Sequence, residues 1–439
     1  MSFDKICQEC NQKYAYFWGW CKPCNLKHFQ NDFDKWTSGN TTIDKFIHNA
    51  QVNTTDEYKA LEWMPYDRFK DIKEIAKGGF GTIYKAKWID GPISGWDVEN
   101  QQWKRWGQRD VALKKFDNNF ACLNEDFLNE IAIHLKTRRE LISLRFYGIT
   151  RDPETREYIM VLDYMNGGNL RDYLKNNFNK IDWKLKLYYL EKLTSNFNRI
   201  HKLDIIHHDF HPGNILSYNF KKNLLYISDF GLSKLIEQNV KNSEKINIFG
   251  VLPYIAPEVL SGKKYTKAAD VYSFGIIVYE IVTGLAPYYD IPHDRDLARQ
   301  ICIGLRPKIP FHIPKLIAQV IMRCWDARVT HRPTFEELNK ELQKYYKDHK
   351  ENNHEEINEI TIQIENSEKV SKNLTLINST PNPMNYKTHP EAIYTSRLLN
   401  YSSLPKPKND ENFENELEEL TKSTSALSIV ASELHVPDF

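Results

Sequence analysis

Apolar residues recur at helical intervals in the N-terminal part of the chain. Between about residues 26 and 64, the repeating positions are Phe29, Phe33, Trp36, Ile43, Phe46, Ile47 and Ala50. Residues three or four positions apart share one face of a helix, so this spacing predicts two amphipathic helices. Thr41, Thr42 and Asp44 are residue types that could cap the start of the second helix.

The pattern changes twice between about residues 69 and 346. Short runs rich in Ile, Val and Tyr come first, around residues 78–81, 111–114 and 158–162, and predict strands. Longer stretches with helical spacing follow at 184–201 and 268–282. Strands early and helices late predict an α+β fold of two lobes, a β-rich N-lobe and a helical C-lobe.

Two stretches fall outside this scheme. Residues 88–108 form an insertion that carries Trp88, Trp96, Trp103 and Trp106, and it is too long for a tight hairpin. Residues 347–439 are rich in Asn, Ser, Glu and Lys, a composition that cannot offset the entropy lost on ordering, so a disordered tail is expected. Within it, residues 413–420 are interpreted as a solvated acidic segment rather than one that folds on a partner.

Charge and hydropathy exclude some classes of function. Lysine and arginine number 59 against 58 acidic residues, a formal net charge of +1, which argues against nucleic acid as a partner. No run of 18 apolar residues suggests a membrane span, and the N-terminal sequence lacks the pattern of a signal peptide. We expect a cytoplasmic protein without a membrane partner, with a nuclear location as the alternative.

Two segments of the strand-rich region have the chemistry of phosphate binding. The run from Ile75 to Tyr84 contains glycines between two strand-like stretches, and glycine lets backbone N–H groups approach phosphates closely. Lys114 ends the run Val111-Ala112-Leu113-Lys114, where its ammonium could hold phosphates. Glu130, in a helical stretch, could orient that ammonium. Taken alone, the glycine run could be an ordinary β-turn. Taken alone, Lys114 and Glu130 could be ordinary surface residues.

Two further segments offer a proton acceptor and metal ligands. Asp209 and Asn214 lie five residues apart in a polar loop between apolar runs. Asp209 could accept a hydroxyl proton, and Asn214 could bind a metal ion. Asp229 ends a strand-like run and is followed by Phe230-Gly231, so its carboxylate could hold Mg²⁺ at phosphates.

Together, and in this order, the four segments resemble the signature set of the eukaryotic protein kinases. Ala256-Pro257-Glu258, the run 270–275 and Arg332-Pro333 extend the match, and the family implies that Glu258 pairs with Arg332. The resemblance gives a protein kinase domain at 67–346, which the tail at 347–439 follows. The apolar spacing described above indicates a helical linker at 31–66, and the N-terminal cysteines described below indicate a zinc-ribbon-like module at 1–30.

The resemblance implies a role for each matching residue. Asp209 resembles the catalytic base, Lys114 and Glu130 the phosphate-holding ion pair, and Asn214 and Asp229 the Mg²⁺ ligands. ATP would be bound by residues of the glycine-rich hairpin, the strands beside it, the gatekeeper and the hinge: Ile75, Gly78, Gly79, Phe80, Gly81, Ile83, Ala112, Lys114, Leu162, Asp163 and Met165.

Four positions depart from the family pattern. Ala76 replaces the first loop glycine, and His208 replaces the arginine that gathers a phosphorylated activation loop, so control by loop phosphorylation is less expected. His211 and Val251 stand where serine/threonine kinases place a lysine and a threonine, which blurs the substrate class.

The family also supplies the alternative to an active enzyme. A pseudokinase would keep this fold as a signalling scaffold, but pseudokinases typically lose the lysine, the base or the metal ligand, and all are present here. Residues 270–275, 304–307 and Cys324-Trp325 are most similar to the tyrosine-kinase-like group, which implies a protein substrate and favours serine or threonine as acceptor.

The N-terminal cysteines form two closely spaced pairs, Cys7 with Cys10 and Cys21 with Cys24. Four thiolates at this spacing are typical of structural Zn²⁺, while redox chemistry or coincidence is the alternative. The order of zinc-ribbon-like head, helical segment and kinase resembles a large fungal kinase family. We expect a partner protein for the zinc module or the tail.

Overall fold

The computed structural model describes residues 6–13, 20–78, 81–116, 125–138, 142–221, 224–235, 248–351, 358–377, 386–401 and 403–422. Gly79 and Phe80 of the predicted nucleotide site lie outside these residues. The chain divides into two compact units, Met1–Met165 and Asn166–Phe439, which we call the N-unit and the C-unit.

The N-unit begins with the predicted helices, α1 (Lys22–Asn31) and α2 (Thr41–Val52). The start of α2 differs from the prediction, because Asn40 is its capping residue and accepts hydrogen bonds from the N–H groups of Thr42 and Ile43. The Asp44 carboxylate instead accepts from the backbone N–H and the hydroxyl of Ser38, which fixes the turn before the helix.

A six-stranded sheet forms the centre of the N-unit, with strands in the order β1-β7-β8-β6-β3-β2. β1 pairs parallel to β7, and the other neighbours are antiparallel. Gly148 in β7 lets β1 approach, because a Cβ atom there would lie 1.9 Å from the carbonyl oxygen of Glu62. The strands are β1 (Glu62–Trp63), β2 (Phe69–Gly78), β3 (Gly81–Trp88), β6 (Arg109–Lys115), β7 (Phe146–Arg151) and β8 (Tyr158–Asp163).

The tryptophan-rich insertion forms a separate hairpin, β4 (Ile93–Asp97) and β5 (Gln102–Arg105). Trp103 stacks on Phe29 of α1 with ring centroids 4.3 Å apart, and Trp96 stacks on His28 at 3.7 Å. Trp20, Phe29, Trp36, Ala60 and Ile93 make one buried cluster. The insertion therefore packs on α1 inside the N-unit.

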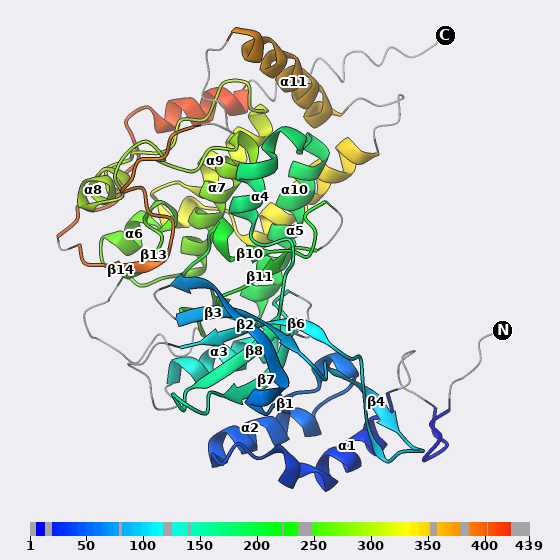
Figure 1. Ribbon diagram of the computed structural model, residues 1–439. Coiled ribbons are helices and arrows are strands. Elements are labelled where there is room, and N and C mark those ends of the chain that lie inside the picture. Colours follow the sequence, from blue (N-terminus) through cyan, green and yellow to red (C-terminus); the bar gives the residue numbers. More distant parts are fainter. Residues whose placement is uncertain are drawn as a thin grey trace, which may run out of the picture. The chain divides into compact units, whose positions relative to one another are not determined.

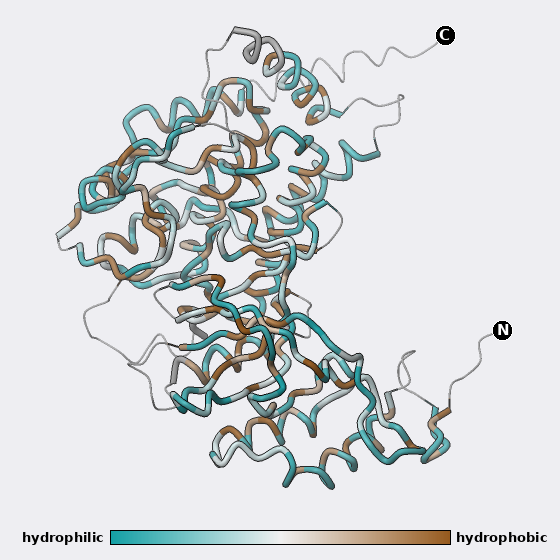
Figure 2. The backbone as a smooth tube through the Cα atoms, in the orientation of Figure 1, coloured by the Kyte–Doolittle hydropathy of each residue, from teal (hydrophilic) through white to brown (hydrophobic). Residues whose placement is uncertain are grey.

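The C-unit is mainly helical (Figure 1). In Figure 2 its hydrophobic segments gather among the helices, and α7 is buried along almost its whole length. The sheet-rich and helical units predicted from the hydrophobic pattern are therefore confirmed. The helices that build its body are α4 (Leu170–Asn177), α5 (Trp183–Lys202), α6 (Pro257–Leu260), α7 (Lys267–Thr283), α8 (Arg295–Cys302), α9 (Lys315–Cys324) and α10 (Phe335–Lys350).

Two pairs of short strands flank the predicted catalytic loop of the C-unit. β9 (Ile205–Ile206) pairs with β12 (Lys234–Leu235), and β10 (Ile215–Leu216) pairs with β11 (Tyr226–Ile227). These pairs bracket the polar loop at 207–214. In the N-unit, α3 (Glu125–Arg138) is the helix predicted to carry Glu130.

The region after residue 346 differs from its predicted disorder in several stretches. α11 (Glu359–Ile377) packs against α10, β14 (Arg397–Leu399) pairs with β13 (Ile248–Gly250), and residues 413–422 are helical. Figure 1 shows β14 (orange) beside β13. Ile360, Leu399 and Phe413 are buried. The average composition of the tail concealed these apolar residues, whose burial offsets the entropy of ordering.

Candidate active site

The N-unit contributes a buried ion pair between β6 and α3. Lys114 Nζ lies 2.6 and 2.8 Å from the two carboxylate oxygens of Glu130, and both side chains are at most 4% exposed. Burial would raise the pKa of Glu130, but the charge of Lys114 and contact with His134 outweigh it and lower the pKa to about 2. The pair is therefore ionised at neutral pH, and the ammonium is fixed in direction.

The glycine-rich hairpin closes between β2 and β3, where Gly78 pairs with Gly81. Gly81 has a φ of +139°, and a Cβ atom there would lie 2.1 Å from the carbonyl oxygen of Lys115. Only glycine fits this conformation and this close approach. Ile83 is opposite Lys114 in the strand register, whereas Ile75 is largely exposed.

The predicted gatekeeper and hinge lie at the end of β8. Leu162 is buried and faces Ala112 of β6 in the strand register. Asp163 forms an ion pair with Arg109 at 3.2 Å, and Met165 is buried. The structure thus brings the predicted nucleotide-binding residues of the N-unit that it describes onto neighbouring strands of one sheet, except Met165, which lies two residues after β8.

The C-unit holds Asp209 and Asn214 together in the loop after β9. Asn214 Nδ2 donates to the backbone carbonyl of Asp209 at 2.9 Å and to its carboxylate at 3.3 Å. This orientation of the amide leaves Oδ1 as the atom that could bind a metal ion. Ser228 donates from its N–H and its hydroxyl to the Asn214 carbonyl, which ties the adjacent Asp229 to the same loop. Asp229 has a φ of 60°, an uncommon conformation for a residue other than glycine.

Asp270, at the start of α7, holds this loop and was not assigned a role from the sequence. Its carboxylate accepts hydrogen bonds from the N–H groups of His207 and His208 and lies 2.9 Å from Nε2 of His201. Burial would raise the pKa of Asp270, but these hydrogen bonds and the neighbouring histidines lower it. An acidic residue in the first turn of a mainly apolar helix was the available sequence signal.

The two unusual histidines of the loop have defined surroundings. His208 stacks on Tyr265 with ring centroids 4.3 Å apart. His211 Nδ1 accepts from the N–H of Gly213, so a neutral His211 carries its proton on Nε2, which lies 3.6 Å from the Asp209 carboxylate. Burial would raise the pKa of Asp209, but His211 and the hydrogen bonds to the carboxylate hold it below its usual value.

A serine of the tail also contacts Asp209, and sequence reasoning missed it. The Ser396 hydroxyl donates to Oδ2 of Asp209 at 2.5 Å and lies 3.3 Å from Nε2 of His211. A single serine in a polar segment did not indicate this contact.

The predicted pair of Glu258 and Arg332 is confirmed, with two hydrogen bonds of 2.8 and 2.7 Å in the interior.

The four N-terminal cysteines converge. Their sulfur atoms all lie within 4.8 Å of one another, with Cys7 and Cys24 3.8 Å apart and Cys10 and Cys21 3.6 Å apart. Four sulfur atoms placed tetrahedrally about 2.3 Å from a zinc ion are separated by about 3.8 Å. A disulfide would require about 2.05 Å. The donor set and its spacing therefore fit Zn²⁺.

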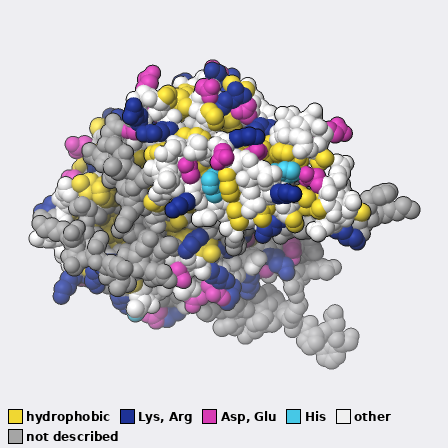
Figure 3. Space-filling model, turned by 90° about the horizontal axis from the view of Figure 1, so that it is seen from below, with side chains coloured by type: hydrophobic (Ala, Val, Ile, Leu, Met, Phe, Trp, Pro, Cys, Tyr) yellow, Lys and Arg dark blue, Asp and Glu magenta, His cyan; other side chains and the backbone are white. Residues whose placement is uncertain are grey.

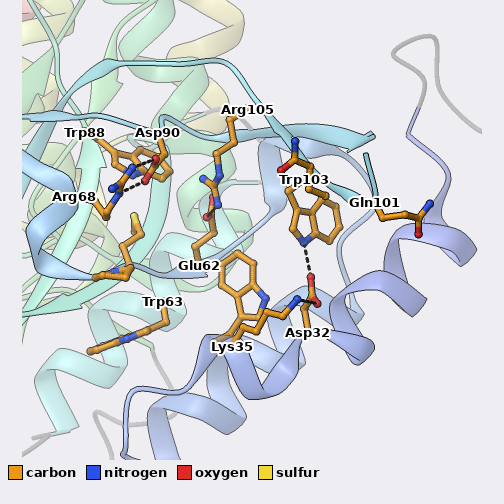
Figure 4. Close-up of a pocket in the computed structure, with 14 residues that line it drawn as sticks. Asp32, Lys35, Glu62, Trp63, Arg68, Trp88, Asp90, Gln101, Trp103 and Arg105 are labelled. Carbon is orange, nitrogen blue, oxygen red and sulfur yellow. Dashed lines mark hydrogen bonds and ion pairs between the residues drawn. The ribbon is translucent and has the colours of Figure 1, made fainter. Parts of the chain in front are cut away.

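A pocket of about 360 Å³ lies elsewhere in the N-unit, between the helices, the β4–β5 hairpin and the sheet (Figure 4). Its charged side chains are paired with one another: Arg105 with Glu62 at 2.5 Å, Lys35 with Asp32, and Arg68 with Asp90. Trp103 donates from its ring N–H to Asp32. These pairs cross-link the elements around the pocket, which contains none of the predicted catalytic residues.

Two observations concern larger partners. On the face seen in Figure 3, basic side chains are interspersed with acidic and hydrophobic ones, and no continuous basic surface is present there. Among the residues that the structure describes, no helix combines the length and the apolar character needed to cross a membrane.

Known proteins resemble this chain over most of the region described above. "Serine/threonine-protein kinase VIK" of Arabidopsis thaliana is 30% identical over 63% of this chain and 60% of its own length. "Tyrosine-protein kinase SPK-1" of Girardia tigrina is 26% identical over 72% of this chain and 66% of its own length. "Dual specificity protein kinase pyk3" of Dictyostelium discoideum is 27% identical over 66% of this chain and 21% of its own length.

Some relatives are much longer than the matching region. The chain spans 18% of the length of two kinase/receptor proteins of Acanthamoeba polyphaga mimivirus, with 27% and 29% identity.

The family described as protein tyrosine and serine/threonine kinase matches residues 69–342, more than half of the chain. The chain therefore belongs to the protein tyrosine and serine/threonine kinase family.

Proposed function

We propose that this chain is an active protein kinase that transfers the γ-phosphate of MgATP to a hydroxyl group of a protein. The observation that carries the proposal is that each unit contains its predicted functional side chains, paired with one another by hydrogen bonds. The N-unit has an ionised, buried Lys114–Glu130 pair, and the C-unit has Asp209 hydrogen-bonded to Asn214.

Each group has a distinct task in phosphate transfer. Glu130 holds the Lys114 ammonium, which binds phosphate oxygens of ATP, while the hairpin at Gly78 and Gly81 offers backbone N–H groups. Asp209 accepts the proton of the attacking hydroxyl, and its lowered pKa keeps it ionised for that task. Asn214 and Asp229 would hold Mg²⁺, which neutralises charge on the phosphates when bound.

We further propose serine or threonine as the acceptor and a place in the tyrosine-kinase-like group. The name of VIK supports serine or threonine as the acceptor, whereas the names of SPK-1 and pyk3 include tyrosine and dual specificity. The place in the tyrosine-kinase-like group is supported only by the resemblance of the runs 270–275 and 304–307 and of Cys324-Trp325. His211 occupies the position of the usual lysine, and its Nε2–H can donate a hydrogen bond near Asp209, although a neutral imidazole supplies less charge than an ammonium.

The alternative is a scaffold that binds nucleotide without turnover, and a matched pair of proteins separates the two. Wild type should transfer labelled phosphate from ATP to protein in the presence of Mg²⁺, and Asp209→Asn should reduce the rate by at least about a hundredfold, the scale of general base catalysis. Equal incorporation by both proteins contradicts the proposal. Phosphoamino-acid analysis of the product then distinguishes serine and threonine from tyrosine.

We also propose that Cys7, Cys10, Cys21 and Cys24 hold a structural Zn²⁺, on the support of four sulfur atoms that lie within 4.8 Å of one another. Elemental analysis of the purified full chain should give about one zinc per chain, and Cys10→Ser with Cys24→Ser should remove it and lower the melting temperature. Cys302→Ser, a buried cysteine of the C-unit, is the matched control and should keep its zinc. A metal content near zero in wild type rejects the site. A cytoplasmic location and a partner protein for this module remain predictions.

A further inference from the structure

The tail lies on the C-unit as an added strand. β14 pairs antiparallel with β13, in the register Ile248 with Leu399, Phe249 with Leu398, and Gly250 with Arg397. β13 ends close to the catalytic loop, because a Cβ atom on Gly250 would lie 3.3 Å from Oδ1 of Asp209. Strand addition is a common way for a protein to bind an extended peptide. The register places the residue before Arg397 beside Asp209.

That residue is Ser396, and its hydroxyl is oriented as a phosphate acceptor would be. The hydroxyl donates to Oδ2 of Asp209 at 2.5 Å, the atom that would remove its proton. Nε2 of His211 lies 3.3 Å from the same oxygen. Asp209 is only 4% exposed with Ser396 in this position, so little room remains for a second hydroxyl at its carboxylate.

Contacts on the N-terminal side of Ser396 hold the segment against other parts of the C-unit. Arg171 donates to the carbonyl of Tyr394 at 2.9 Å and lies over its ring, whose hydroxyl donates to the carbonyl of Pro287 at 2.8 Å. The backbone N–H of His293 donates to the backbone carbonyl of Glu391 at 3.0 Å. The ring Nδ1 of His293 lies 2.9 Å from the carbonyl of Ile393.

Further contacts extend along the rest of the segment. The backbone N–H of His389 donates to the backbone carbonyl of Tyr289 at 2.7 Å. The Arg397 guanidinium donates to the carbonyl of His293 at 2.5 Å. Ala392 and Leu399 bury their side chains on either side of the serine. Backbone hydrogen bonds with side chains buried at intervals are the features by which an extended peptide is recognised.

A second stretch anchors the tail further along. Asn409 exchanges hydrogen bonds with Asp326 and the N–H of Ala327, at 2.8 and 2.7 Å. Glu414 forms an ion pair with Arg328, and Phe413 is buried. This anchor keeps the serine at a high effective concentration at Asp209.

We propose that Ser396 is an intramolecular phosphorylation site and that residues 386–401 are the kinase's own peptide substrate. This inference rests on the proposed kinase activity. The Ser396 oxygen attacks the γ-phosphorus of ATP, the bond from that phosphorus to the ADP oxygen breaks, and the serine proton passes to Asp209. The products are phosphoserine and ADP.

The product does not fit where the substrate lay. A phosphoserine carries a charge of about −1.5 to −2 at neutral pH, and it would face the carboxylate of Asp209 at hydrogen-bond distance. Like charges at this separation repel, so phosphorylation releases the segment from Asp209. The unphosphorylated tail blocks other substrates, and its modification opens the site to them.

The test measures phosphorylation of the full chain with MgATP, using peptide mass mapping. Wild type should acquire about one phosphate at Ser396, at a fractional rate that is unchanged when the protein is diluted roughly a hundredfold, because a tethered acceptor has a fixed effective concentration. Ser396→Ala should lose this label. Ser403→Ala, which alters an exposed tail serine, should retain it.

The same assay separates this inference from the proposed function through a second substrate. A synthetic peptide with the sequence of residues 386–401 is supplied to Ser396→Ala and to Asp209→Asn. If chains phosphorylate the peptide or one another but Ser396 stays unmodified, or its labelling rate falls with dilution, the intramolecular site is wrong and the kinase stands. If wild type phosphorylates neither itself nor the peptide, the intramolecular site and the proposed kinase activity are both wrong.

Discussion

At the scale of single residues, the Lys114–Glu130 pair shows how a functional group can dominate local stability. Both charges are removed from water, and each is compensated by its partner at hydrogen-bond distance. Removing one partner of a buried ion pair leaves the other charge without compensation, at a cost of about 3–5 kcal/mol, whereas removing both often costs little. The role proposed for this pair in phosphate transfer is therefore coupled to the stability of the N-unit.

Lys114→Met should abolish phosphate transfer and also lower the stability of the protein at pH 7, by roughly 3 kcal/mol. The double variant Lys114→Met with Glu130→Gln should recover much of the stability and none of the activity. Lys87→Met, on an exposed position of β3, is the control. Thermal unfolding provides the measurement, and a single variant as stable as wild type contradicts the argument.

The pH dependence of this pair has a definite sign. The folded pKa of Glu130, about 2, lies below its unfolded value of about 4.3, so the pair stabilises the protein above pH 4 and loses this contribution as the pH falls toward 2. In Lys114→Met the loss of the ammonium raises the pKa of Glu130. Acidification should therefore narrow the difference in stability between this variant and wild type.

At the scale of elements, helix α5 contains a lysine, Lys186, whose charged form is destabilised by burial. Lys186 is buried, its ammonium lies over the rings of Phe178 and Trp183, and it donates to the carbonyl of Val282 at 3.1 Å. Burial lowers the pKa of Lys186 to about 7, while the acidic side chains Glu368 and Asp182 act in the opposite direction. Near neutral pH, part of the population folds with a charged amine in the interior.

Lys186→Met should raise the free energy of unfolding by roughly 1–3 kcal/mol at pH 7, because a methionine fills the space without a charge. Lys184→Met, on an exposed position of the same helix, should have little effect. Between pH 7 and about 10 the unfolded lysine keeps a proton that the folded one releases, so wild type should gain stability with rising pH and the advantage of the variant should shrink. Denaturant unfolding at pH 7 and pH 9 measures both effects, and an advantage that grows with pH contradicts the assignment.

At the scale of the whole chain, the tail acts on a site far from it in sequence. Residues 386–401 cover Asp209, and the anchor at 403–422 holds them there through Phe413, Asn409 and Glu414. The contacts given above for the anchor are made with Asp326, Ala327 and Arg328. Its contribution is to the local concentration of the covering segment, so weakening it should expose Asp209 without altering the chemistry.

Phe413→Ala should release the tail, because burying a phenylalanine side chain contributes about 1.5–3 kcal/mol. The initial rate at which the synthetic 386–401 peptide is phosphorylated should rise about tenfold or more, which is the effect of 1.4 kcal/mol on an equilibrium constant. Amide hydrogen exchange in β14 should become faster. Glu419→Ala, an exposed residue of the same helix, is the control and should change neither measurement. An unchanged rate in Phe413→Ala would show that this anchor does not hold the covering segment.

Local sequence was sufficient for the parts of the site built by neighbouring residues. Gly78 and Gly81 predicted a hairpin, the five-residue spacing of Asp209 and Asn214 predicted one polar loop, and the cysteine pairs predicted a cluster of four sulfur atoms. The start of α2 was placed at the wrong capping residue, because Asn40 and Thr41 are both good capping types and only the local fold chooses between them.

By itself the sequence indicated the kinase family through the resemblance of its motifs, and it indicated the sheet-rich and helical units through periodicity. The roles of the reacting groups are predictions from the same motifs. Only the tertiary structure decided the role of Asp270, the packing of the β4–β5 hairpin on α1 and the position of Ser396. Each of these depends on contacts between segments distant along the chain. Such contacts are set by strand register and by the burial of a few apolar side chains, neither of which a local pattern records.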